Sequence, residues 1–299
     1  MSEKISDPDK IDEMLVKLRI EREKRVHPAK DTKIITAWNG LMISAFAKSA
    51  PVFEDNDFLI AAQNAADFIL SNLVEDGKLY HSYSKNKRSG SGYLDDYVYF
   101  IEGLIDLYEA DFNVKWLKNA EKFADSLISD FWYNDDSCFN YASDNHKNVL
   151  VKFRPSYDQA LPSGNAVAAM ALQKLSVLTG KEEYKQKAER ILNRFQNDIK
   201  KSPRGFCFML CAMDFYLHGA TEIAIIGAKD KKEVFSVIYN TFLPNKIIAF
   251  SENGDDEFLP LLKNKKIIDG KTTVYLCKDY QCKAPVTSTE ELKKLIRSH

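Results

Sequence analysis

The stretch that decides the fold reads YVYFIEGLIDLYEADFNVKWLKNAEKFADSLISDF and spans residues 97–131. Its first part, 97–110, is apolar on most sides, which predicts a helix that is buried on more than one face. Its second part carries Trp116, Ala120 and Leu127 on one helix face, with charged residues on the other. The stretch therefore predicts a helical hairpin with a buried inner helix and an amphipathic outer one.

The same pattern occurs three times. Apolar first helices are expected at 37–50, 97–110 and 166–178, each followed by an amphipathic helix. In each second helix an aromatic residue is followed four positions later by alanine and eleven positions later by a large apolar residue. The three sets are Phe58, Ala62 and Ile69; Trp116, Ala120 and Leu127; and Tyr184, Ala188 and Phe195. A unit that recurs about every 60 residues is typical of stacked helical hairpins.

The pattern changes at Thr221. Strands are expected at 222–227, 246–250 and 272–277, with a helix at 231–242. A Ser288–Glu291 capping box predicts a final helix. The expected fold is mainly α: residues 1–220 form part of an (α/α) helical-hairpin toroid, and residues 221–299 form a small α/β subdomain. No glycine-rich phosphate loop is present, so a nucleotide cofactor is not expected.

Composition excludes some functions. The 299 residues include 42 Lys+Arg and 43 Asp+Glu, so a charge-driven nucleic-acid binder is not expected. No apolar run is long enough for a membrane span, and the polar N-terminus lacks a signal-peptide core. Five cysteines favour a reducing cytoplasm. Cys207 with Cys211, and Cys277 with Cys282, are interpreted as packing residues rather than as a zinc or redox site, and no cofactor is expected.

Acidic loop segments precede the first helices and should meet at one end of a ring of hairpins. Carboxylates beside aromatic rings suit a sugar, and two carboxylates are the usual apparatus of glycoside hydrolysis. The same residue types are also ordinary helix N-caps, which is the structural alternative. The expected catalytic residues are Asp31, Asp95, Asp96 and Asp158. The expected substrate-binding residues are Arg25, Trp38, Asn39, His81, Tyr97, Arg154, Tyr157, Ser163 and Asn165.

Five segments carry a family resemblance: 25–28, 31–42, 92–97, 158–165 and 277–285. Together they resemble the YyaL / spermatogenesis-associated protein 20 family, in that family's order. The resemblance implies a six-hairpin glycosidase-like toroid related in shape to the N-acylglucosamine 2-epimerases. Family members usually carry a thioredoxin-like domain and the first hairpins upstream. This chain is therefore expected to be a fragment, half of a split gene, or a shortened open ring.

Three functions stay open on sequence alone. The first is a carbohydrate-binding or carbohydrate-active toroid that uses the acidic residues, with a small sugar as ligand. The second is a non-catalytic interaction module whose open end docks a thioredoxin-like chain, an upstream half-toroid chain or a second copy. The third is a sugar epimerase of the 2-epimerase type, with His81 and His218 as proton carriers.

Overall fold

The computed structural model describes residues 7–146, 149, 151–229, 231–254 and 258–297. The chain divides into two compact units, Met1–Lys33 and Ile34–His299. Helix α1 (Pro8–Glu23) belongs to the first unit, and none of its residues is buried. All other helices and strands belong to the second unit.

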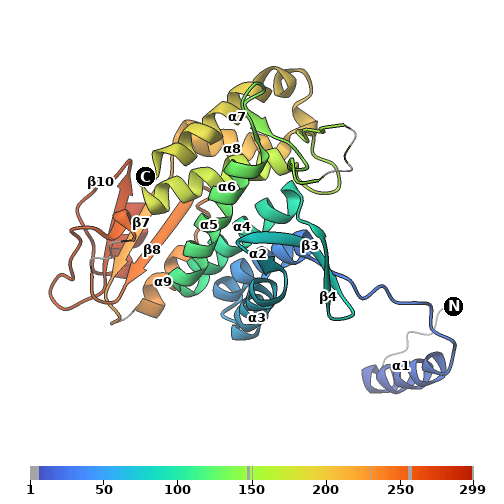
Figure 1. Ribbon diagram of the computed structural model, residues 1–299. Coiled ribbons are helices and arrows are strands. Elements are labelled where there is room, and N and C mark those ends of the chain that lie inside the picture. Colours follow the sequence, from blue (N-terminus) through green and yellow to red (C-terminus); the bar gives the residue numbers. More distant parts are fainter. Residues whose placement is uncertain (1–6, 147–148, 150, 230, 255–257, 298–299) are drawn as a thin grey trace. The chain divides into compact units, whose positions relative to one another are not determined.

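The second unit is built from helical hairpins (Figure 1). Helix α2 (Thr36–Phe53) pairs with α3 (Asn56–Asn72), α4 (Leu94–Asp111) with α5 (Val114–Phe131), and α6 (Gly164–Thr179) with α7 (Glu182–Lys201). The short η1 (Pro203–Gly205) then leads to α8 (Cys207–His218). Helices α2, α4, α6 and α8 pack on one another in that order and form the inner layer. The three predicted helix pairs are thereby confirmed.

The burial of the helices agrees with this order of packing. Helix α4 is buried from Leu94 to Tyr108 apart from Asp95, because it lies between α2, α5 and α6. The predicted stripe of the outer helices is also buried: its three alanines, Ala62, Ala120 and Ala188, are fully inaccessible. Helix α2 differs, because it buries Ile43 and Ala47 yet leaves Trp38 and Met42 61% and 49% exposed. The inner layer is therefore open along one side of α2.

Helices α2 and α4 approach one another closely at two glycines. A Cβ atom on Gly40 would lie 2.6 Å from the backbone nitrogen of Phe100, and one on Gly103 would lie 2.7 Å from the carbonyl oxygen of Gly40. Real Cβ atoms do not approach backbone atoms this closely. The two glycines therefore allow the crossing of these inner helices.

Charged groups occupy part of the interior. Lys174 on α6 forms ion pairs with Glu102 and Asp106 on α4, and Lys48 on α2 pairs with Asp106 at 2.8 Å. Burial alone would lower the pKa of Lys174, but Asp106 and Glu102 together raise it. Burial alone would raise the pKa of Asp106, but Lys174 and Lys48 hold it below its usual value. The three inner helices are thus joined by a buried network of charges.

Short strands connect the hairpins. Strands β1 (Ile34–Ile35), β2 (Val74–Glu75) and β4 (Lys87–Ser91) all pair antiparallel with β3 (Lys78–Ser84). Strands β5 (Trp132–Tyr133) and β6 (Cys138–Phe139) form a second small antiparallel pair.

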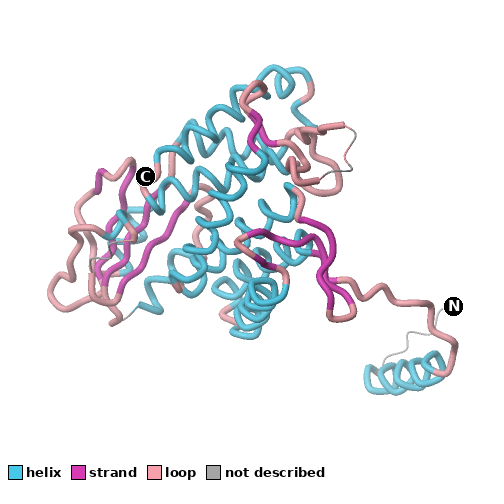
Figure 2. Tube along the Cα trace, viewed as in Figure 1, coloured by secondary structure: helices cyan, strands magenta, loops and turns pink. Residues whose placement is uncertain are grey.

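A four-stranded sheet follows α8, with the order β10-β9-β7-β8. Figure 2 shows its strands in magenta. Strands β7 (Thr221–Ile226) and β8 (Lys246–Ser251) are parallel, and β9 (Thr273–Lys278) and β10 (Gln281–Cys282) complete the sheet with antiparallel pairing. The connection from β7 to β8 contains α9 (Lys231–Tyr239); η2 (Pro260–Leu262) precedes β9, and α10 (Thr289–Arg297) ends the described chain.

The sheet joins the two hydrophobic cores. One face contributes Ala224 and Ala249 to the main core of the hairpins, and the other packs Ile223 and Leu276 with α9 and α10. Glu109 on α4 links the hairpins to the sheet, since its Oε1 accepts a hydrogen bond from the Ile248 amide at 2.9 Å. The N-cap half of the predicted capping box is confirmed: the Ser288 hydroxyl accepts from the Glu291 amide. The same hydroxyl donates to the Glu291 carboxylate.

One sequence interpretation is wrong. Cys277 and Cys282 are joined by a disulfide rather than acting as separate packing residues, because the β9–β10 hairpin places them directly opposite one another. Cys138, Cys207 and Cys211 are free thiols. None of the helices within the described ranges is both long and apolar enough to cross a membrane.

Candidate functional site at the helix N-termini

Two carboxylates hold the N-terminal ends of the inner helices together. Asp96 in the first turn of α4 accepts hydrogen bonds from the amides of Ala37 on α2 and Tyr93, both at 2.9 Å. Asp158, in the loop before α6, accepts from the amides of Ser163 and of Phe208 on α8, both at 2.8 Å. The first amides of a helix lack partners within the helix and carry partial positive charge, so carboxylates stabilise them.

The acidic loops before α4 and α6 therefore do converge, but Asp96 and Asp158 have a structural duty there. Each of their four oxygens already accepts a backbone N–H. This is the N-cap role that the sequence left as an alternative.

Asp95 is the carboxyl group that has no such structural role. Among the described residues, nothing donates a hydrogen bond to its buried Oδ1. Its neighbour is Gly164 at the start of α6, where a Cβ atom would lie 2.6 Å from that oxygen. Burial, with the adjacent Asp96 charge as the second cause, raises the pKa of Asp95 to about 6. Perturbed carboxyl groups of this kind are more frequent at functional sites than elsewhere.

Aromatic rings surround this end of α4. Tyr93 stacks on Tyr141 and on His146, with ring centroids 5.1 and 4.6 Å apart. Tyr99, one turn after Asp95, donates its hydroxyl to the Pro162 carbonyl at 2.5 Å. Burial, followed by the charge of Asp95, raises the pKa of Tyr141 to about 12. The hydroxyl groups of Tyr99 and Tyr141 therefore stay protonated at neutral pH.

His81 completes the group. Its Nδ1 lies 2.9 Å from Asp96 Oδ2, and its ring meets Tyr93 edge to face at 5.4 Å. The His81 side chain is 37% exposed, whereas Asp96 is 1% exposed. A buried carboxylate that contacts one ring nitrogen fixes the orientation of the imidazole. The role of His81 as a proton carrier stays a prediction.

Four of the expected binding residues lie near the ends of these helices, and three of them have local partners. Trp38 is exposed in the first turn of α2, and Asn39 beside it donates to the Ile35 carbonyl at 2.9 Å. Ser163 caps α6 by accepting from the Ala166 amide. Asn165 is completely buried and bonds to both backbone groups of Phe139. Only Trp38 offers a free apolar surface.

Three other expected residues have different surroundings from those predicted. Tyr97 is 2% exposed and packs against Phe123 and Phe131, so a stacking role for its ring faces does not fit this position. Arg154 pairs with Asp136 at 2.9 Å. Tyr157 is half-exposed, and its ring lies against Gly205, where a Cβ would clash with it.

Asp31 and Arg25 belong to the first unit. Asp31 is exposed and forms an ion pair with Lys33 at 3.1 Å, as the sequence also allows. Its convergence with the other carboxylates stays a prediction. His218, expected as a proton carrier, is the last residue of α8, whereas Phe208 at the other end of that helix contacts Asp158. His218 is exposed and pairs with Asp214, so it does not share a site with His81.

Sequence pattern alone does not single out Tyr93, Tyr141 or His146. Tyr141 and His146 follow β6 in a segment without regular secondary structure, where the spacing of apolar residues gives no signal. The sequence does contain a signal for part of this group. The residues at i, i+4, i+7 and i+11 of α4 share one helix face, and they are Asp95, Tyr99, Glu102 and Asp106. In the part of the chain that is described, no group of three or more His, Cys, Asp or Glu side chains is arranged to hold a metal ion.

Comparison with known proteins identifies relatives of this chain by sequence. No family model matches it. Its sequence is 28% identical to spermatogenesis-associated protein 20 of Homo sapiens over 300 residues, which cover 94% of this chain. This chain resembles spermatogenesis-associated protein 20 over nearly its whole length. The predicted family resemblance is thereby confirmed.

The likeness extends to other animals. An uncharacterised protein of Caenorhabditis elegans, B0495.5, is 26% identical over 95% of this chain. The chain spans only 38% of the human spermatogenesis-associated protein 20 and 40% of the nematode protein. The activity and partners of those longer proteins therefore do not transfer directly.

A solved structure shares the fold. The GH76 α-mannanase BT2949 of Bacteroides thetaiotaomicron superimposes with a TM-score of 0.52 and covers 90% of this chain and 76% of its own, at 13% sequence identity. The likeness confirms the predicted class, an α/α toroid of the glycosidase type. At this identity it shows the fold alone.

Proposed function

We propose that this chain is a carbohydrate-active toroid in which Asp95 transfers a proton to or from a bound sugar. The observation that carries the proposal is the state of the Asp95 carboxyl: its buried Oδ1 receives no hydrogen bond from any described residue, and its pKa is raised to about 6. A general acid or base works best when its pKa lies near the operating pH. The fold shared with an α-mannanase supports a carbohydrate as the ligand class.

The neighbouring residues support this choice. Asp96 and Asp158 use both oxygens to hold helix ends, so Asp95 is the carboxyl left for proton transfer. His81, oriented by Asp96, is the second group that can carry a proton. Tyr93 and Trp38 supply aromatic surface, which suits the apolar faces of a pyranose ring. In this arrangement Asp95 protonates the leaving oxygen of a glycoside.

A thermal-shift screen tests the proposal. The purified chain is heated with monosaccharides, N-acyl sugars and short oligosaccharides. A ligand at about a hundred times its dissociation constant adds roughly 2.7 kcal/mol, which shifts the Tm by a few degrees. We expect one sugar class to raise the Tm of the wild type and of the control Asp198→Asn, a half-exposed site on α7, but not of Asp95→Asn. A flat response to every sugar class would contradict the proposal.

Solvent deuterium distinguishes hydrolysis from epimerisation. An enzyme of the 2-epimerase type removes and returns a proton on the sugar, so deuterium enters the ligand. Incubation of the sugar that shifts the Tm in deuterated buffer should leave its C–H bonds unlabelled if Asp95 acts in hydrolysis. Labelling of the sugar would assign epimerisation to the same site.

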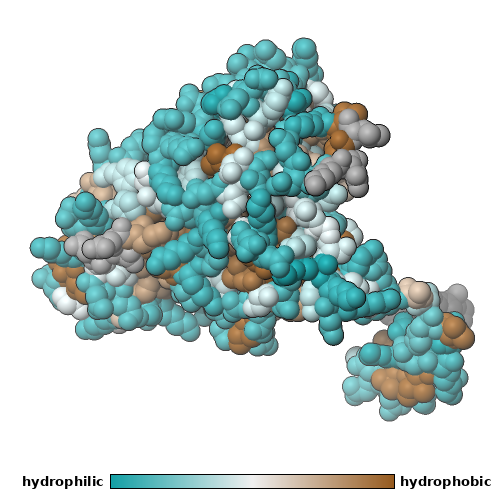
Figure 3. All heavy atoms as spheres, viewed as in Figure 1, coloured by the Kyte–Doolittle hydropathy of each residue, from teal (hydrophilic) through white to brown (hydrophobic). Residues whose placement is uncertain are grey.

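An interaction role is the second candidate, and the exposed side of α2 favours it. Trp38, Met42 and Val52 are spaced along one face of this inner helix and are 61%, 49% and 44% exposed. Much of the molecular face in Figure 3 is hydrophilic, and its hydrophobic patches are small. The human relative has far more sequence than this chain spans. We propose that further helical hairpins of a longer or separate chain cover this face of α2.

Binding of an apolar dye tests this second candidate. Dye fluorescence with the isolated chain should rise with protein concentration and should fall in the double variant Trp38→Ser/Met42→Ser. The matched control Val149→Ser/Val151→Ser alters exposed apolar residues outside α2. A wild type that is strictly monomeric and binds no dye would contradict a docking face on α2.

A further inference from the structure

A hairpin with an unfavourable backbone lies beside a cavity of the structure. Strands β9 and β10 are joined by the two residues Asp279 and Tyr280, both with positive φ, at 49° and 60°. Two-residue hairpins of this type favour Asn, Asp and Gly. A bulky side chain such as tyrosine disfavours the left-handed region, so Tyr280 keeps this conformation only while its surroundings impose it.

Three contacts hold Tyr280 in this conformation. The disulfide between Cys277 and Cys282 joins the second residue pair from the turn. The Tyr280 amide donates to Glu222 Oε2 on β7 at 3.0 Å, and Glu222 is 3% exposed. The Tyr280 hydroxyl donates to the Val177 carbonyl near the end of α6, also at 3.0 Å. The turn is thus fixed to the sheet on one side and to a helix on the other.

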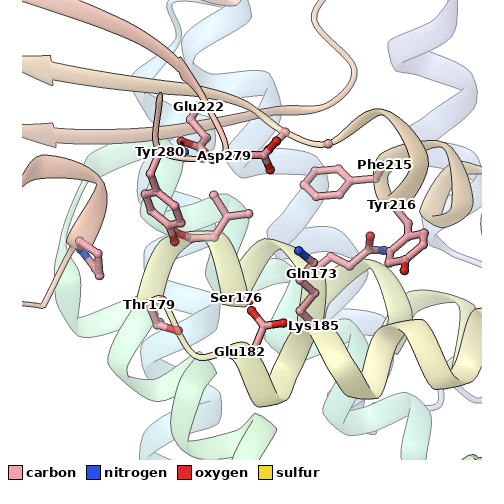
Figure 4. Close-up of a pocket in the computed structure, with 15 residues that line it drawn as sticks. Gln173, Ser176, Thr179, Glu182, Lys185, Phe215, Tyr216, Glu222, Asp279 and Tyr280 are labelled. Carbon is pink, nitrogen blue, oxygen red and sulfur yellow. Dashed lines mark hydrogen bonds between the residues drawn. The ribbon is translucent and has the colours of Figure 1, made fainter. Parts of the chain in front are cut away.

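The same turn forms a wall of a cavity of about 610 Å³ (Figure 4). Asp279 and Tyr280 line it from the hairpin, and Phe215 and Tyr216 line it from α8. Glu182 and Lys185 lie on the α7 side. This volume is in the range of small-molecule sites, and a change in the turn changes the shape of the cavity directly.

We propose that the Cys277–Cys282 disulfide is a redox latch that sets the shape of this cavity. When oxidised, the pair holds Tyr280 at positive φ against α6. When reduced, the turn loses one of its three restraints, Tyr280 relaxes to a favourable conformation, and its hydroxyl leaves the Val177 carbonyl. The latch is independent of the proposed role of Asp95.

The two sulfurs differ in access, which sets the route of reduction. Cys282 is exposed, whereas Cys277 is 1% exposed. A thiolate of a dithiol reductant attacks the Cys282 sulfur, the S–S bond breaks, and the Cys277 sulfur leaves as a thiolate that takes up a proton. The second thiol of the reductant then attacks the mixed disulfide. Cys282 is released as a thiol, and the reductant becomes a disulfide. The pair gains two electrons and two protons.

The closed loop is short, so reduction need not unfold the protein. The cysteines are five residues apart, and a disulfide that closes a short loop restricts the unfolded chain less than one that closes a long loop. A purely structural disulfide would stay oxidised while the protein is folded. A latch changes state in the folded protein.

Thiol titration and hydrogen exchange in redox buffers of a dithiol and its disulfide test the latch on the whole chain. We expect the free thiols to rise from three to five as the buffer becomes reducing, with the cooperative melt retained. The Tyr280 amide should then exchange at least tenfold faster, while the Leu276 amide within the β9 ladder stays protected. Reoxidation should restore slow exchange at Tyr280.

Variants separate the latch from general loosening. Cys277→Ser/Cys282→Ser should show fast exchange at Tyr280 in every buffer, and the control pair Cys207→Ser/Cys211→Ser on α8 should behave as the wild type. The latch is overturned if the pair stays oxidised in all buffers that keep the protein folded, if reduction abolishes the melt, or if reduction leaves exchange at Tyr280 unchanged.

Discussion

Replacing Lys174 with methionine should destabilise the folded chain by about 3–5 kcal/mol. The Lys174 ammonium pairs with both Glu102 and Asp106, whose side chains are 10% and 1% exposed. Without it, two carboxylates stay buried, and Lys48 is the cation among the described residues that still pairs with Asp106. Lys48 is 59% exposed, so solvent screens its charge and it compensates little. Urea unfolding at pH 8 measures the loss.

A triple variant distinguishes unpaired charge from lost packing. Glu102→Gln/Asp106→Asn/Lys174→Met removes all three charges, and it should recover most of the stability that the single variant loses. Lys174 helps to hold the pKa of the Asp106 carboxyl below its usual value, so its loss raises that pKa. A raised carboxyl pKa costs stability as the pH rises through it. The single variant should therefore be less impaired at pH 4 than at pH 8. Equal losses in the single and triple variants would show that the charges are not the cause.

Gly103→Ala should destabilise the chain by about 2 kcal/mol, even though alanine is the better helix former. The new Cβ would lie 2.7 Å from the Gly40 carbonyl oxygen, so α2 and α4 must move apart. Overpacking a core of this kind costs about 3 kcal/mol, and the higher helix propensity of alanine returns about 1 kcal/mol. Thermal and urea unfolding measure the difference.

Gly270→Ala is the matched control for this substitution. A Cβ atom on Gly270 would have no other atom within 4 Å, so it would meet no clash. The cost of the substitution comes only from placing alanine at a positive φ of 65°. That cost is about 1 kcal/mol. A Gly103→Ala variant more stable than wild type would show that the helices do not cross as closely as described.

The helix pairs could be predicted because burial leaves a direct trace in the spacing of apolar residues. Trp116, Ala120 and Leu127 share a buried face in the structure as they share one in the sequence. The meeting of the acidic loops before α4 and α6 could also be predicted, since the N-termini of stacked inner helices face one end.

The duty of each acidic residue could not be predicted. Asp95 and Asp96 are adjacent and chemically alike, yet Asp96 binds two backbone amides and His81, while Asp95 turns toward Gly164. Tyr97 and Tyr93 are likewise separated by only one helical turn. Tyr97 packs into the hairpin core, and Tyr93 lies among the rings at the helix end. Such differences depend on tertiary contacts that a single sequence does not display.

The pairing of Cys277 with Cys282 required the register of a hairpin. Four intervening residues are compatible with a loop, a metal site or a two-residue turn. Only the turn places the cysteines opposite one another, and its residues, Asp279 and Tyr280, are not the usual sequence signal for it.

The pKa of the Asp95 carboxyl is the most direct test of the central claim. The chain is labelled with ¹³C at its aspartate carboxyl carbons and titrated by NMR, and the Asp95 signal is assigned as the one missing from Asp95→Asn. We predict a midpoint near 6, because burial and the Asp96 charge disfavour ionisation. A midpoint near 4, the value of an exposed aspartate, would contradict the assignment of Asp95 as the proton-transferring residue of the site.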